Sequence, residues 1–91
     1  MKIREGFVLR RIPGMNLVMP AGENIRTFDK AVMLNDTCAF IFEKLQAGET
    51  EEAIAKAMTE KYDVELSRAA EDVKDTFALF AEAGLAEESR A

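Results

Sequence analysis

The spacing of apolar residues changes near residue 35, and this change constrains the fold more than any other feature of the sequence. Before it, short apolar runs are separated by turn signals such as Pro13-Gly14, a pattern typical of strands. After it, apolar residues recur at intervals of three and four, which is the pattern of amphipathic helices. The chain is therefore expected to fold as an α+β domain in which a sheet comes first and helices follow.

Three short strands are expected in the first third of the chain, at residues 7–12, 15–19 and 25–34. Pro13-Gly14 joins the first two, and Pro20-Ala21-Gly22 ends the second. Asp29-Lys30 is a point at which a bend or bulge would divide the third strand. Tight turns between successive strands favour a three-stranded antiparallel meander.

The next two helices have clear start and stop signals. Asn35 or Asp36 can accept the first backbone N–H groups of a helix that ends at Gly48. Thr50 can cap a second helix, which runs to a short link at 63–66. The residues expected to face the core from these two helices are Cys38, Ile41, Phe42, Leu45, Ile54, Ala57, Met58 and Tyr62.

The third helix carries more apolar surface than one core-facing stripe needs. Its expected N-cap is Ser67, and Gly84 is expected to end it in a Schellman motif that places Leu85 against Phe80. One stripe consists of Ala70, Val73, Phe77 and Phe80, and a second of Ala69, Thr76, Leu79 and Ala83. The second stripe is a broader core, a homodimer interface, or one wall of a groove where a sheet edge pairs with an extended peptide.

With 91 residues, the chain is long enough for one domain and too short for two. Residues 1–91 are therefore expected to form a single domain, with strands at about 6–34 and helices at about 36–84. The helix-link-helix at 50–83 resembles a helix-turn-helix, and the N-terminal hairpins resemble a wing. The expected fold is winged helix-turn-helix-like, a three-stranded antiparallel sheet followed by three helices. Residues 87–91 have nothing to bury and are expected to fray.

The composition argues against catalysis and against bound metals or cofactors. One cysteine and no histidine leave no disulfide framework, no Ser-His or Cys-His nucleophile, and too few ligands for zinc or haem. No apolar run approaches the roughly 20 residues that span a bilayer, and the N-terminus does not read as a signal peptide. We therefore expect a cytoplasmic, non-enzymatic protein with no metal, no cofactor and no membrane association.

The charge is divided unevenly along the chain. Residues 1–35 hold six basic and three acidic residues, a net +3, whereas residues 36–91 hold six basic and fourteen acidic ones, a net −8. The third helix would be the DNA-reading helix of a winged helix, yet its polar face is mostly acidic, and phosphates would repel it. Nucleic acid is therefore not an expected partner, and a nucleic-acid adaptor is only the second interpretation. A structural dimerisation module is the third.

Several segments resemble PqqD-like proteins. They are the run at 31–42 (AVMLNDTCAFIF), the segments at 48–54 (GETEEAI) and 61–64 (KYDV), and Ala70-Glu71-Asp72-Val73 followed by Phe77, Phe80, Gly84 and Leu85. The resemblance extends over nearly the whole chain, from Gly6 onward. The N-terminal third lacks the aromatic-rich second strand of the pyrroloquinoline-quinone pathway member. The chain is therefore identified as similar to the wider family and not assigned to that pathway.

The resemblance implies a peptide-binding domain that holds the leader segment of a ribosomally synthesised precursor peptide. In the family the leader adds as a strand beside the third strand, over a cleft formed with the third helix, and is presented to a modifying enzyme, often a radical S-adenosylmethionine protein. Carried onto this sequence, the strand side is Arg26, Phe28, Lys30 and Val32, and the helix side is Ala69, Asp72, Val73, Thr76, Phe77 and Phe80. The charges of Arg26 and Lys30 lead us to expect an acidic leader.

Overall fold

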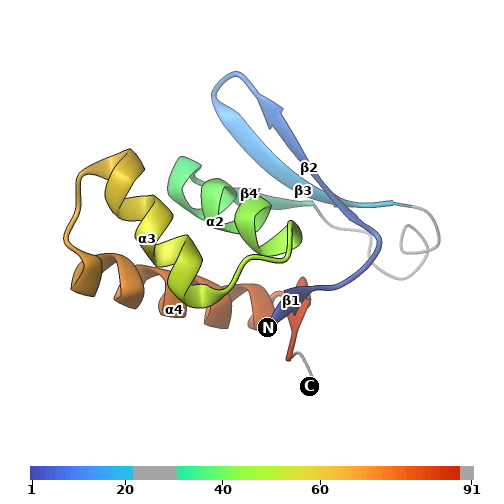
Figure 1. Cartoon of the computed structure of the whole chain (residues 1–91). Coiled ribbons are helices and arrows are strands. Elements are labelled where there is room, and N and C mark those ends of the chain that lie inside the picture. Colours follow the sequence, from blue (N-terminus) through green and yellow to red (C-terminus); the bar gives the residue numbers. More distant parts are fainter. Residues whose placement is uncertain (22–30, 89–91) are drawn as a thin grey trace.

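The computed structural model describes residues 1–21 and 31–88. Figure 1 shows a three-stranded sheet, a small two-stranded sheet at the termini, and a group of helices. The elements are β1 (Lys2–Ile3), β2 (Phe7–Ile12), β3 (Met15–Pro20), β4 (Val32–Leu34), α2 (Asp36–Gln46), α3 (Glu51–Tyr62), α4 (Leu66–Glu82) and β5 (Ala86–Glu87). The fold is the expected α+β arrangement, in which a three-stranded antiparallel sheet precedes three helices.

The three-stranded sheet has the order β2-β3-β4 and is antiparallel throughout. A two-residue turn at Pro13-Gly14 joins β2 to β3, and Gly14 has a φ of 80°, which an L-residue rarely adopts. The first two predicted strands are confirmed, with β3 extending to Pro20. The predicted third strand began at residue 25. Residues 25–30 lie outside the described part of the chain, Ala31 is not in a strand, and Val32–Leu34 form β4.

The two termini meet in a sheet that the sequence pattern does not indicate. β1 pairs with β5, so that Lys2 lies opposite Glu87, and the prediction that Glu87 belongs to a frayed tail is wrong. The backbone N–H of Arg4 donates to the carbonyl of Leu85 at 2.8 Å, and its guanidinium donates to the carbonyl of Gly84 at 3.2 Å. These bonds join segments about eighty residues apart in the chain, which local spacing cannot reveal.

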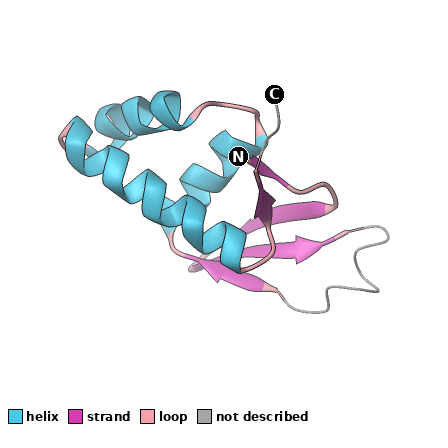
Figure 2. Ribbon diagram, turned by 90° about the horizontal axis from the view of Figure 1, so that it is seen from below, coloured by secondary structure: helices cyan, strands magenta, loops and turns pink. Residues whose placement is uncertain are grey.

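The core lies between one face of the three-stranded sheet and the helices (Figure 2). Phe42 of α2 and Phe80 of α4 are fully buried at its centre, with ring centroids 5.6 Å apart and planes at 83°. This edge-to-face geometry is one that aromatic pairs favour. The core predictions for α2 and α3 hold for Ile41, Phe42, Leu45, Ile54 and Met58, whereas Cys38, Ala57 and Tyr62 are half-buried.

Two predictions for α4 are wrong. The helix begins at Leu66 after Glu65, which makes no side-chain capping bond, so Ser67 lies inside the helix and does not cap it. Its buried residues are Ala69, Val73, Thr76, Phe77 and Phe80. Ala70 was expected in the core but is exposed, because the helix is rotated so that its flank containing Ala69 and Thr76 faces inward. Half of the apparent surplus stripe is therefore core.

The C-terminus of α4 has the predicted Schellman motif. Gly84 has a φ of 79°, its N–H donates to the carbonyl of Ala81, and the N–H of Leu85 donates to the carbonyl of Phe80 at 2.9 Å. Leu85 is fully buried. A glycine in the left-handed conformation at a helix end allows the last carbonyl groups of the helix to accept these hydrogen bonds and places the next residue in the core.

Asn35 caps α2, and its side-chain oxygen accepts from the N–H of Cys38 at 2.8 Å. Replacing Asn35 with alanine is expected to lower the free energy of unfolding by about 1 kcal/mol, because an orphan N–H of the first turn loses its partner. Thermal or urea unfolding followed by circular dichroism measures this change. Asn35→Asp is the matched control, since a carboxylate can accept the same bond, and an equal loss in both variants would contradict a capping role.

Candidate functional site

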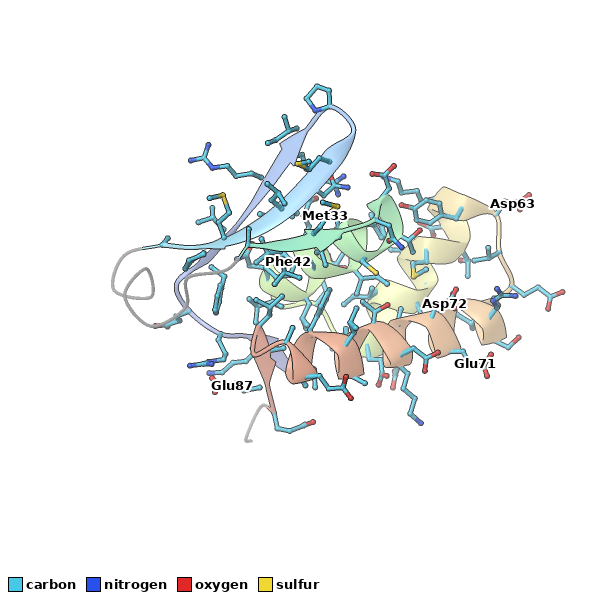
Figure 3. All side chains as sticks on the ribbon, turned by 180° about the vertical axis from the view of Figure 1, so that it is seen from behind. Met33, Phe42, Asp63, Glu71, Asp72 and Glu87 are labelled. Atoms are coloured by element: carbon cyan, nitrogen blue, oxygen red, sulfur yellow. The ribbon has the colours of Figure 1, made fainter. Side chains whose placement is uncertain are left out.

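The candidate site begins at the free edge of β4. In the described part of the chain β4 pairs only with β3, so its other edge has no partner strand. Figure 3 shows that this edge is directed toward α4, and that Met33 of β4 and Asp72 of α4 lie on the same face of the molecule. An unpaired strand edge exposes N–H and C=O groups that can pair with another extended chain.

The register identifies which residue of β4 offers its backbone to that edge. In a two-residue hairpin the residues flanking the turn, Ile12 and Met15, form a hydrogen-bonded pair, and such pairs alternate along an antiparallel ladder. Leu17 therefore bonds to β2, so its pairing with Met33 on the other side is a non-hydrogen-bonded one. The N–H and C=O of Met33 consequently point to the free edge, while Val32 and Leu34 bond to β3.

The helix wall of the site is one flank of α4. Helical geometry places Asp72, Leu79 and Ala83 on one side of the buried stripe, and Ala70, Lys74 and Ala81 on the other. The second flank lines the surface cavities shared with residues 48–55, at the start of α3. The flank with Asp72 and Leu79 therefore faces away from α3, toward the side on which Figure 3 shows β4.

The structure does not gather all of the predicted site residues on this wall. Asp72 is half-buried on the β4-facing flank, and Thr76 is beside it but only 8% exposed. Ala69, Val73 and Phe80 are fully buried in the core.

The remaining predicted residues lie elsewhere or outside the described chain. Phe77 is 8% exposed and lines a cavity of about 700 Å³ on the opposite flank, beside Gly48 and Glu51. Val32 is half-buried and packs against the core. Arg26, Phe28 and Lys30 lie outside the described residues.

Two exposed apolar residues that were not among the predicted site residues border the site. Met33 is 66% exposed on β4, and Leu79 is 50% exposed on α4. Leu79 belonged to the second apolar stripe that the sequence indicated on this helix. Ala69 and Thr76 of that stripe are buried in the core, whereas Leu79 is exposed. Exposed apolar side chains beside an unpaired edge are suited to contact an added strand.

The polar chemistry of the site is limited. Asp72 forms an i,i+4 ion pair with Arg68, with 3.7 Å between Nε and Oδ1, and both side chains are accessible to solvent, so the pair adds little stability. No group of three or more potential metal ligands occurs among the residues that the structure describes. Within the same residues, no helix is long and apolar enough to cross a membrane.

Comparison with known proteins places this geometry in context. The family model described as coenzyme PQQ synthesis protein D (PqqD) matches residues 16–86. Among solved structures, the chain is similar to TbiB1 in complex with the TbiA(beta) leader peptide, with a TM-score of 0.81, 22% identity and full coverage of both chains. It is also similar to lasso peptide synthetase B1 complexed with the leader peptide, with a TM-score of 0.78, 23% identity and 96% coverage of both chains. No curated protein gives a significant match.

Proposed function

This chain belongs to the PqqD family, a family of non-catalytic peptide-binding domains, and we propose on that basis that it captures the leader segment of a ribosomally synthesised precursor peptide. The observation that carries the proposal is the free edge of β4, which lies on the same face as the flank of α4 that contains Asp72 and Leu79. The two similar structures, as their titles state, are complexes with leader peptides. Their likeness to this chain supports the same class of ligand.

Capture proceeds by strand addition. The outward N–H and C=O of Met33 pair with the backbone of the leader, which gives affinity that tolerates many leader sequences. Side chains of the leader alternate between the two faces of the extended sheet. Those directed to the helix side contact the exposed side chain of Leu79, and this contact selects among leaders.

Arg26 and Lys30 of this chain precede β4 in the sequence and are positively charged. The leader is therefore expected to carry acidic residues in the part that binds near the N-terminal end of the third predicted strand. The bound leader is then presented to a modifying enzyme, for which a radical S-adenosylmethionine protein is our first candidate. The present chain supplies positioning only, since binding the leader raises the local concentration of the attached core peptide near the enzyme.

Isothermal titration calorimetry with the precursor peptide, and with its leader segment alone, tests the proposal. Both peptides are expected to bind, because the leader contains the recognised segment, and the core peptide alone is not. Binding of an extended chain also removes apolar surface from water, so a negative heat-capacity change is expected. Failure of the full precursor to bind would contradict the proposed function.

Leu79→Glu is expected to weaken leader binding about tenfold, since a carboxylate would have to lose water where an apolar contact forms. The measurement is the same titration. Ala78→Glu is the matched control, because it adds the same charge one residue away on an exposed position of the opposite flank, beside the cavity shared with α3. Equal weakening by both variants would indicate a general charge effect and would contradict contact with Leu79.

A further inference from the structure

The outer face of the three-stranded sheet is apolar and uncovered by any helix of the described chain. The strand register puts seven side chains on this face: Val8, Arg10, Ile12, Met15, Leu17, Met19 and Met33. Five of them are exposed large apolar residues, and Leu17 is half-buried. The opposite face of the same strands carries Phe7, Val18 and Leu34, which enter the core beneath α2.

An apolar outer face is unusual in a sheet whose outer side is exposed to solvent. In an antiparallel sheet with one solvated face, the outward positions are normally polar. Here the cross-strand pairs Val8–Met19 and Ile12–Met15 place apolar side chains directly opposite each other. The hairpin that carries these pairs extends beyond the helices (Figure 1). Contiguous apolar surface of this kind marks protein interaction sites.

The charge on the face restricts what can cover it. Arg10 is the one charged member of the seven, and no acidic residue is among them. A second copy of the chain packed face to face would therefore bury two guanidinium groups with no carboxylate from either face to pair with them, which is costly. A partner that presents an apolar surface with a carboxylate opposite Arg10 avoids this cost.

The face is also continuous with the proposed leader site. Met33 belongs to both, since its side chain is on the outer face and its backbone points to the free edge of β4. A protein bound to this face would contact the sheet immediately beside the added leader strand. We infer that the outer face, centred on Leu17 and Arg10, is the docking surface for the modifying enzyme, which contributes an apolar patch containing an Asp or Glu. This inference rests on the proposed function.

The test uses the full chain, the precursor peptide, and a purified candidate for the modifying enzyme, with a radical S-adenosylmethionine protein as the first candidate. Arg10→Glu and the double variant Ile12→Thr/Met15→Thr are expected to lower affinity for the enzyme at least about tenfold. Both variants should bind the leader within about twofold of the original chain, because neither changes the free edge of β4. Lys56→Glu on α3 is the matched control for the charge reversal, and it is expected to bind the enzyme normally. A Lys in place of the enzyme's facing carboxylate should restore binding to Arg10→Glu.

The outcomes separate this inference from the proposed function. Normal leader binding together with unchanged enzyme affinity in both face variants would overturn the docking surface alone. Failure of the original chain to bind the leader would contradict the proposed function instead. Sedimentation of the chain by itself adds a further check, since a dimer that dissociates in the Ile12→Thr/Met15→Thr variant would assign the face to a second copy and overturn the inference.

Discussion

Proline in place of Met33 is expected to weaken leader binding about tenfold or more while leaving the sheet intact. The N–H of Met33 points to the free edge of β4, so its loss removes no hydrogen bond between β3 and β4. Proline is tolerated in edge strands when its missing N–H faces outward. Leaving a leader carbonyl without this donor lowers the binding free energy by about 1–3 kcal/mol, or roughly 5- to 150-fold in affinity. The proline ring also obstructs the incoming strand.

Two control variants isolate the backbone contribution at this edge. Met33→Thr keeps the N–H and removes the apolar side chain, so it should weaken binding less than proline does. Val32→Pro removes an N–H that bonds to β3, and it should therefore lower the unfolding temperature, which Met33→Pro should not. Calorimetric titration and thermal unfolding measure the two effects separately. If Met33→Pro binds the leader normally, the leader does not add to β4.

The local signals of this sequence predict local structure well. Asn35 or Asp36 was predicted to cap the first helix and Thr50 the second. Asn35 and Thr50 each accept the backbone N–H three residues later, and Asp36 lies inside α2. Gly84 and Leu85 form the predicted Schellman motif. In these cases the residue and its partner are three to five positions apart, so the chemistry of the capping residue alone fixes the contact.

The site depends on relations that no local pattern contains. The exposure of Leu79 follows from the rotation of α4, which is set by packing against α2 and α3 and not by the apolar spacing of α4 itself. The outward backbone of Met33 follows from hydrogen-bond alternation that starts at the turn between Ile12 and Met15, on a different pair of strands. A one-residue error in either relation moves the predicted contacts to another face.

The same limit explains why the resemblance gave a helix wall that is mostly core. A family correspondence matches positions along α4, and it does not distinguish residues that touch a ligand from those that support the wall from behind. Thr76, which is buried, shows the consequence. A large charged residue at position 76 could not reach the site without displacing its neighbours. Such a variant would therefore measure the stability of the core and not leader binding. Leu79 is the position on this flank where a change tests binding.

Phe80→Ala is expected to lower the free energy of unfolding by about 3–5 kcal/mol, because it leaves a cavity at the centre of the core. Phe80 is fully buried, and its ring meets the ring of Phe42 edge to face. A domain of this size has a total stability of about 5–15 kcal/mol. The change should therefore lower the unfolding temperature by roughly 15 °C or more. Urea unfolding of the original chain and the variant measures the loss directly.

The decisive comparison is between stability and leader affinity, since the resemblance places Phe80 among the peptide contacts while the structure buries it completely. Measured at a temperature where the variant is folded, leader affinity should match that of the original chain, because the contacts at Met33 and Leu79 are unchanged. Phe42→Ala is the matched control from α2, and the double variant should show a coupling of about 0.5–1.5 kcal/mol in stability. A folded Phe80→Ala variant that binds the leader much more weakly than a folded Phe42→Ala variant would return Phe80 to the binding site. The groove would then have to open deeper between β4 and α4 than the closed core allows.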